Sequence, residues 1–166
     1  DFKGQKIRTM ENSYHMDFWK ALKANPTPMT FSEVYIGLQQ KTIDAQENPY
    51  EVIVSSKLYE QQDYVVETNH LPHYISLIVS DEFYKDLPKD QQKIISEAAE
   101  TAKEYARKAS DERIEDRMKV IKDSGTKIVR LDKKTQEDVR KASSDIYKSI
   151  EENVSKDVFD AYLNQK

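Results

Sequence analysis

The sequence contains no cysteine and only three glycines, Gly4, Gly37 and Gly125, among its 166 residues. Without cysteine, disulfide bonds, thiolate zinc sites and cysteine nucleophiles are excluded together. The common nucleotide-binding loops need several closely spaced glycines to bring backbone amides around phosphate, so these loops are excluded too. A basic excess is also missing, because 26 Lys and Arg stand against 30 Asp and Glu and leave a net charge of −4. We therefore expect no nucleic-acid partner.

Long hydrophobic runs are missing as well. No stretch approaches the ~18 consecutive apolar residues that a membrane span requires, and the first residues, DFKGQKIRTM, lack the apolar segment of a signal peptide. The chain starts at Asp1, inside a strand-like segment, so we expect it to be processed or part of a longer protein. Length and composition otherwise fit one ordinary domain.

The first half alternates between strand-like and helix-like segments. The expected order is a strand at 5–9, a helix at 11–24 that ends at 25–28, a helix at 30–40, a strand at 42–45, and a helix capped by Asn48 with Pro49 as its first residue. This alternation favours an α/β fold with crossover connections. Two further strands are expected at 64–67 and 74–79, because both segments are rich in β-branched and aromatic residues.

One very long helix dominates the second half. Its pattern runs from Pro88 to about Lys122, and Gly125 is the expected residue just beyond its carboxyl end. At ~1.5 Å per residue the helix is about 50 Å long, more than a compact domain of this size covers comfortably. Its numerous Lys and Glu residues suit a solvated surface rather than a binding patch. A strand at 127–131 and two closing helices complete the prediction.

Three residues of the first half are candidates for binding an anion. Arg8 lies near a strand end, where a planar guanidinium fits a carboxylate with two hydrogen bonds; from spacing alone, a structural ion pair is the simpler explanation. Asn48 can offer a hydrogen bond to a carboxylate or hydroxyl beside a helix amino terminus, although a plain helix cap is simpler. Phe31 can wall a pocket where a loop becomes a helix, although packing is the more common role.

Patterns typical of catalysis or metal binding do not stand out. The three histidines, His15, His70 and His73, are too scattered for a zinc site, which needs three or four convergent ligands. No GxSxG motif marks a serine nucleophile, and the carboxylates lie mainly on amphipathic helices. We therefore expect a protein that is not an enzyme and that has no cofactor and no metal.

Four sequence pieces carry a resemblance to a known family. They are KGQKIR at 3–8, NPTPMTFSEVY at 25–35, LQQKTIDAQENP at 38–49 and LPKDQQKII at 87–95. In this order and at these intervals they resemble the solute-binding proteins of TRAP transporters, the DctP-type family. The likeness runs through the whole chain and is strongest from residue 3 to residue 50.

The resemblance implies an α/β fold of the periplasmic-binding-protein type, a two-lobed clamshell in which the very long helix bridges both lobes. It implies that Arg8 pairs with a ligand carboxylate, that Asn48 adds a hydrogen bond and that Phe31 lines the cleft. The implied partners are a small organic acid and integral-membrane TRAP permease subunits. The implied location is periplasmic or extracytoplasmic, free or lipid-anchored, and the complete protein is expected to be a monomer.

The chain also departs from the family pattern. Lys41 and Ala45 stand where the family often has glycine, so the turn before the QENP segment is expected to differ in shape. The family's amino-terminal part of the first lobe has no counterpart here. The expected organisation assigns residues 1–72 to the second, carboxylate-binding lobe. Residues 73–125 form a crossover strand and the bridging helix, and residues 126–166 a strand and carboxy-terminal helices that pack on the lobes.

The favoured hypothesis is a non-catalytic receptor that captures a carboxylate-bearing metabolite and delivers it to a membrane permease. The alternative is a helical interaction or scaffolding domain, which the charge-rich second half motivates and which predicts no response to small molecules. Among ligands, C4-dicarboxylates, sugar acids, sialic acid and 2-oxo or 2-hydroxy acids all stay open.

Overall fold

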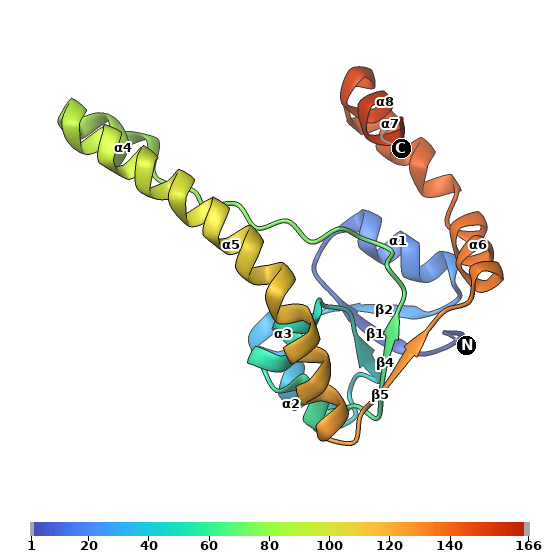
Figure 1. Ribbon diagram of the computed structural model, residues 1–166. Helices are drawn as coiled ribbons and strands as arrows, with labels where there is room; N and C mark the ends of the chain where they lie inside the picture. Colours follow the sequence, from blue (N-terminus) through green and yellow to red (C-terminus); the bar gives the residue numbers. More distant parts are fainter. Residues whose placement is uncertain (1, 165–166) are drawn as a thin grey trace.

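The computed structural model describes residues 2–164. A three-stranded parallel sheet forms the amino-terminal part of the fold (Figure 1). Its strands are β1 (Lys6–Thr9), β2 (Asn25–Pro28) and β3 (Ala45–Gln46), in the order β2-β1-β3. The central strand β1 places Arg8 in register with Thr27 of β2 and Gln46 of β3. The predicted strand at 5–9 is confirmed, and parallel pairing of successive strands requires the crossover connections that the alternating pattern indicated.

The edge strand β2 was not expected from the sequence, which marks residues 25–28 only as the end of a helix. Proline has no backbone N–H and is therefore confined within sheets to edges, strand starts and bulges. β2 lies at the sheet edge, with Pro26 paired to Ile7 and Pro28 to Thr9. The same prolines thus follow helix α1 (Ser13–Ala21) and still permit pairing on one side.

The larger apolar core lies among α2 (Val34–Gln39), α3 (Tyr50–Ser55) and the carboxyl-terminal part of α5 (Lys89–Asp123). Short 3₁₀ turns at Phe31–Glu33 and Leu58–Gln61 precede α2 and follow α3. The buried members of this core are Val34, Leu38, Ile43, Ile53, Leu58 and Ile121. A second cluster of Ile7, Trp19 and Ala24 joins β1 to α1.

Two strands far apart in sequence form a second parallel pair. β4 (Tyr64–Glu67) lies beside β5 (Lys127–Arg130), and both strands occupy segments where the sequence predicts them. Between them in the chain lies α5, which packs against both α3 and β5. The long helix is therefore part of the connection between the two strands, and it covers one side of the larger core.

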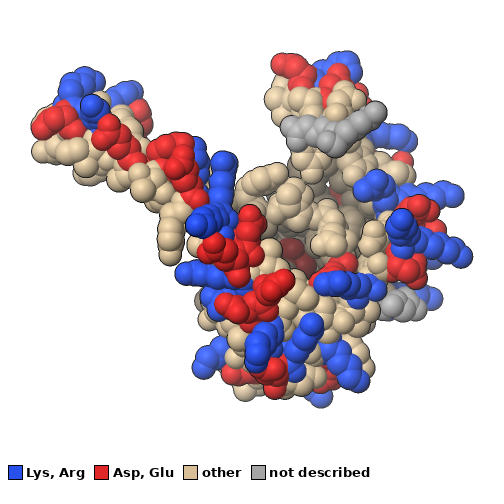
Figure 2. Space-filling view, in the orientation of Figure 1, with Lys and Arg blue, Asp and Glu red and all other residues tan. Residues whose placement is uncertain are grey.

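The length of α5 is confirmed, since it runs over 35 residues and starts directly after Pro88. It ends before Gly125, whose φ of +96° is readily adopted only by glycine. Its amino-terminal part projects from the rest of the molecule beside α4 (Asp81–Asp86) (Figure 1). Basic and acidic side chains alternate along this projecting arm (Figure 2), as expected for a solvated helix.

The prediction of a strand at 74–79 is wrong for this structure. Within residues 2–164 the segment pairs with no strand, and its side chains face solvent. Ile75 is 87% exposed and Ile78 is 85% exposed. β-branched and aromatic residues make a segment suitable for a sheet, but a strand forms only where a neighbouring strand supplies hydrogen bonds and packing.

Three helices form the carboxyl-terminal part, namely α6 (Lys133–Ala142), α7 (Asp145–Asn153) and α8 (Lys156–Leu163). The side chain of Asp132 caps α6 by accepting a hydrogen bond from the Thr135 amide at 2.8 Å. α7 packs against α1, which brings the end of the chain back to the first sheet. Throughout residues 2–164, no helix is long and apolar enough to cross a membrane.

Candidate functional site

Arg8 is buried near the carboxyl end of the central strand, with 4% of its surface exposed. Its Nε and Nη2 atoms donate to the carbonyl oxygen of Met29, at 2.9 and 2.7 Å, and Met29 directly follows β2. Within residues 2–164 no carboxylate forms a contact ion pair with the guanidinium; Glu47 attracts it only through space. Burial lowers the pKa of Arg8, and Glu47 opposes this shift. The site therefore holds a buried cation whose remaining N–H groups are available to an anion.

Phe31 lies against this cation. The Cζ atom of Arg8 is 5.7 Å from the centre of the Phe31 ring, which is the geometry of a cation–π contact. Phe31 opens the 3₁₀ turn after β2 and keeps 45% of its surface exposed. Its ring can therefore touch both Arg8 and a molecule bound beside Arg8.

Asn48 comes to the same sheet edge, but it is not the helix cap that the sequence predicts. The cap of α3 is Pro49, and the Asn48 side chain instead donates from Nδ2 to Oε1 of Gln46 at 2.7 Å. Gln46 is the β3 residue in register with Arg8. The structure thus connects Asn48 to Arg8 through one intervening residue, while its amide oxygen accepts no hydrogen bond from residues 2–164.

These three predicted residues come from segments that follow or end neighbouring parallel strands. In open α/β sheets, ligands bind outside the carboxyl ends of the strands, because loops and helix starts converge there. Arg8 lies near the end of β1, Phe31 follows β2 and Asn48 follows β3. The parallel sheet therefore gathers at one edge three side chains that are separated by up to forty residues in sequence.

A buried acidic residue beside this edge was missed by sequence reasoning. Oε1 of Glu47 lies 3.7 Å from Nδ1 of His15, and its Oε2 lies 3.7 Å from Nε2 of His70. All three side chains are at most 15% exposed. The Nδ1 atom of His15 is buried without a hydrogen-bond partner. His70 Nδ1 lies 2.7 Å from the Thr68 hydroxyl, so that hydrogen bond orients the His70 ring.

The environment shifts the protonation of this cluster. Burial raises the pKa of Glu47 to about 7, against the attraction of Arg8, which lowers it. Burial also lowers the pKa of His70 to about 4, with the nearby His15 acting in the same direction. The pKa of His15 is lowered by burial as well. Near neutral pH the two imidazoles are therefore neutral, and Glu47 lies close to its titration midpoint.

The sequence offers one signal for Glu47. It stands in an uninterrupted polar run, Gln46-Glu47-Asn48, directly at the end of a strand that reaches into the sheet. The histidines were set aside because they are far apart in sequence, and the fold brings two of them to one carboxylate. Within residues 2–164, no group of three or more His, Cys, Asp or Glu has the arrangement of a metal site.

A hydrogen-bond network fixes the start of α3 beside Asn48. The Tyr50 hydroxyl donates to Oε1 of Glu67 at 2.6 Å, and Nε of Arg130 lies 2.9 Å from Oε2 of the same carboxylate. Burial and the hydrogen bond to Glu67 raise the pKa of the Tyr50 hydroxyl. Because Glu67 ends β4 and Arg130 ends β5, the second sheet holds the segment that carries Asn48.

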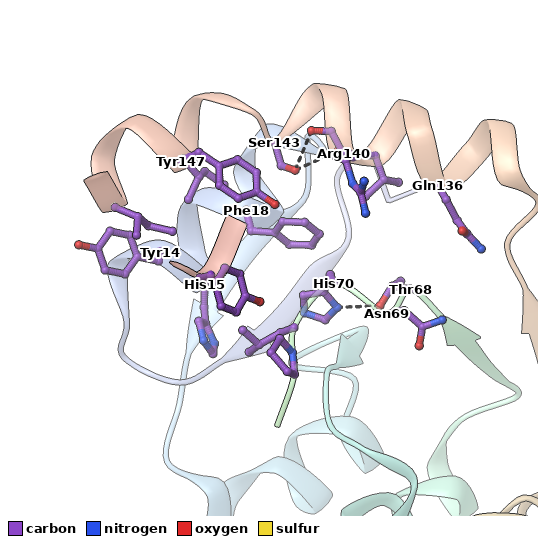
Figure 3. A pocket seen from close by; sticks show the side chains of 16 residues that line it. Tyr14, His15, Phe18, Thr68, Asn69, His70, Gln136, Arg140, Ser143 and Tyr147 are labelled. Atoms are coloured by element: carbon purple, nitrogen blue, oxygen red, sulfur yellow. Dashed lines mark hydrogen bonds between the residues drawn. The ribbon is translucent and has the colours of Figure 1, made fainter. Parts of the chain in front are cut away.

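A cavity of about 400 Å³ lies on the other side of the two histidines (Figure 3). It is bounded by α1, by the loop at 68–72 and by the carboxyl-terminal helices. His15 and His70 line it, whereas Arg8, Phe31 and Asn48 do not. The cavity is thus adjacent to the cationic sheet edge but distinct from it.

A family model described as DctP, bacterial extracellular solute-binding protein, family 7, matches residues 1–153. The chain is 35% identical over 142 residues to the 2,3-diketo-L-gulonate-binding periplasmic protein YiaO of Escherichia coli (strain K12). That match covers 83% of this chain and 42% of YiaO.

Solved structures agree with this match. A TRAP periplasmic solute-binding protein from Polaromonas sp. JS666, bound to D-erythronate, is 34% identical with a TM-score of 0.90; the match covers 97% of this chain and 52% of that chain. Another from Shewanella oneidensis, with bound succinate, is 31% identical with a TM-score of 0.88; the match covers 97% and 53%. The chain therefore spans about half the length of the solved relatives it matches.

Proposed function

The chain belongs to family 7 of the bacterial extracellular solute-binding proteins, the DctP family, and we propose from this that it captures a small organic anion by its carboxylate. The captured anion is delivered to integral-membrane permease subunits of a TRAP transporter. The location that goes with this role is the periplasm, in agreement with the names of the relatives. Enzymatic activity is no part of this role, because the family is one of binding proteins.

The observation that carries the proposal is the unpaired, buried guanidinium of Arg8. A buried charge is expensive unless an opposite charge or hydrogen-bonding groups compensate it. The Met29 carbonyl satisfies only part of the donor set of Arg8, and Glu47 is close to half-protonated near pH 7. A ligand carboxylate would supply both the missing charge and two well-placed acceptors.

Phe31 and Asn48 complete the proposed site. The Phe31 ring would cover one face of the ligand while keeping its contact with Arg8. The amide oxygen of Asn48, which is free while its Nδ2 donates to Gln46, would accept a hydrogen bond from a ligand hydroxyl. This pair of groups suits hydroxylated acids as well as simple dicarboxylates, a class that includes the molecules bound by the two solved relatives.

We also retain the division of the chain as a proposal. Residues 1–72 would form the carboxylate-binding lobe, residues 73–125 would reach towards a second lobe through α5, and residues 126–166 would pack on the lobes. Ligand contacts to both lobes would then favour a closed state over an open one, as in hinge closure generally.

Calorimetric titration with succinate and a panel of sugar acids tests the proposal. We expect Arg8→Ala to weaken binding by roughly two orders of magnitude, because it removes the charge that the ligand carboxylate needs. Arg8→Lys should recover only part of the loss, since an ammonium cannot form the planar two-bond pairing. Arg107→Ala, which removes an exposed arginine of α5, is the matched control and should bind normally.

Near-native affinity in both Arg8 variants would remove Arg8 from the site. Absence of binding to every acid would instead favour the alternative of a helical interaction domain, which predicts no response to small molecules. A thermal-shift measurement on the same panel gives an independent readout, because a ligand that binds only the folded state raises its apparent stability.

A further inference from the structure

The cavity between α1, the loop at 68–72 and the carboxyl-terminal helices has no part in the proposed carboxylate site (Figure 3). Its volume of about 400 Å³ lies within the range of pockets that hold small molecules, roughly 300 to 1,000 Å³. Its walls come from segments far apart in sequence, so only the folded chain creates it.

Aromatic rings form much of the cavity wall. Phe18 of α1 stacks on His70 with their ring centres 4.7 Å apart and their planes inclined by 17°. The rings of Tyr14 and Tyr147 line the same cavity from α1 and α7. Flat apolar walls of this kind favour a ligand with an aromatic or cyclic apolar body.

The charge of the wall has one sign. Arg140 of α6 is the only lining residue among the described ones that is formally charged at neutral pH, and none of those residues is acidic. Within residues 2–164 Arg140 has no ion-pair partner, and its side chain extends from α6 towards the part of the cavity that contains Phe18 (Figure 3). In a chain with a net charge of −4, this local arrangement selects an anionic group.

Two of the other polar side chains in the wall, Gln136 and Ser143, already donate hydrogen bonds to the protein. The Gln136 side-chain amide donates to the Leu131 carbonyl, and the Ser143 hydroxyl donates within its own helix. Because it is charged, the guanidinium of Arg140 is the strongest hydrogen-bond donor that these lining residues offer to a ligand. An anion at Arg140 with its apolar body against Phe18 would use both features of the cavity.

We propose that this cavity is a second binding site, which takes an amphipathic organic anion with an aromatic or cyclic body and pairs its anionic group with Arg140. The site is separate from the Arg8 edge, because none of the three residues proposed there lines it. It nevertheless shares His15 and His70 with the cluster around Glu47, so a ligand here would contact the two imidazoles that flank Glu47.

Trp19 supplies a direct readout for this proposal. It is the single tryptophan of the chain, it is buried, and its ring centre lies 5.1 Å from those of both Phe18 and His70. Titration of the 166-residue chain with phenylbutyrate should therefore give a saturable change in tryptophan fluorescence. Its neutral analogue phenylbutanol should bind about tenfold more weakly, since it cannot pair with Arg140.

Variants and shift mapping complete the test. Arg140→Gln should weaken phenylbutyrate binding about tenfold. Ile146→Phe should abolish it by filling the cavity, and Arg107→Gln on the exposed face of α5 should leave it unchanged. Amide chemical shifts induced by phenylbutyrate should cluster in the 68–72 loop and in α6 and α7.

Three results would overturn the proposal: no saturable signal, equal affinity in the Arg140→Gln variant, or amide shifts centred on residues 8 and 46–48. The last result would mean that phenylbutyrate occupies the carboxylate site, which would support the proposed function while excluding the second site. Failure of succinate to bind at Arg8 leaves the phenylbutyrate measurements unaffected, so the two proposals can fail independently.

Discussion

Replacing Glu47 by glutamine should change how the stability of the protein depends on pH. The folded-state pKa of this carboxyl is about 7, against an ordinary value of 4.5, because the side chain is buried. Over this interval the folded protein keeps a proton that the unfolded chain releases, so the free energy of unfolding falls as pH rises. A pKa shift of this size changes the free energy of unfolding by ~3 kcal/mol between low and high pH, since one pKa unit corresponds to about 1.4 kcal/mol.

His70 acts in the opposite sense. Its pKa falls from 6.5 to about 4 on folding, so the unfolded chain holds a proton that the folded protein lacks. Its contribution therefore makes stability rise with pH between about 4 and 6.5. In the wild-type protein the Glu47 slope opposes the His70 slope over their common range. The Glu47→Gln variant keeps the His70 slope, and the lowered pKa of His15 acts in the same direction.

Urea unfolding followed by circular dichroism, at pH values from about 4.5 to about 7.5, measures this effect. The stability of Glu47→Gln relative to wild type should increase by ~3 kcal/mol across the series. At the lowest pH Glu47 is protonated in the folded protein, so the difference in stability between wild type and Glu47→Gln there measures any change in packing. Glu137→Gln, an exposed carboxylate on α6, is the control and should change the pH profile little. Parallel profiles for wild type and Glu47→Gln would refute the argument that burial keeps this carboxyl protonated.

Three further variants test the packing. Ile121→Ala should lower the free energy of unfolding by ~2–5 kcal/mol in urea titrations, because Ile121 is fully buried in the larger core; a loss below 1 kcal/mol would contradict that placement. Thr126→Val should lower the free energy of unfolding by ~1–3 kcal/mol, because the buried Thr126 hydroxyl donates to the carbonyls of Tyr59 and Gln62. An unchanged urea midpoint would show that water satisfies these two carbonyls in the variant. Ile75→Lys together with Ile78→Lys should reduce concentration-dependent light scattering without changing the free energy of unfolding, because both side chains are exposed to solvent. A large loss of stability would mean that these two side chains pack against the rest of the protein.

The sequence alone predicts the elements that depend on local patterns. The long helix follows from an uninterrupted helical pattern between Pro88 and Gly125. The α/β class follows from the alternation of segments. In each case the determining interactions lie within a few residues, so no knowledge of distant neighbours is needed.

Pairing between distant segments decided the remaining features. β2 forms despite two prolines because it occupies a sheet edge, and residues 74–79 stay unpaired because no neighbouring strand is present among the described residues. Asn48 bonds Gln46 rather than capping α3, an outcome that depends on where β3 ends.

The sequence identified Arg8, Phe31 and Asn48 as candidates through motif resemblance, and the tertiary structure brought them to one edge of a parallel sheet. Only the tertiary structure reveals that Arg8 lacks a contact ion pair in residues 2–164, or that Glu47 lies between His15 and His70. The burial of a side chain and its ion-pair partners depend on residues that the fold brings together from several segments. A sequence pattern shows only the neighbours along one segment. The residue types were therefore readable from the sequence, but their electrostatic state was set by the fold.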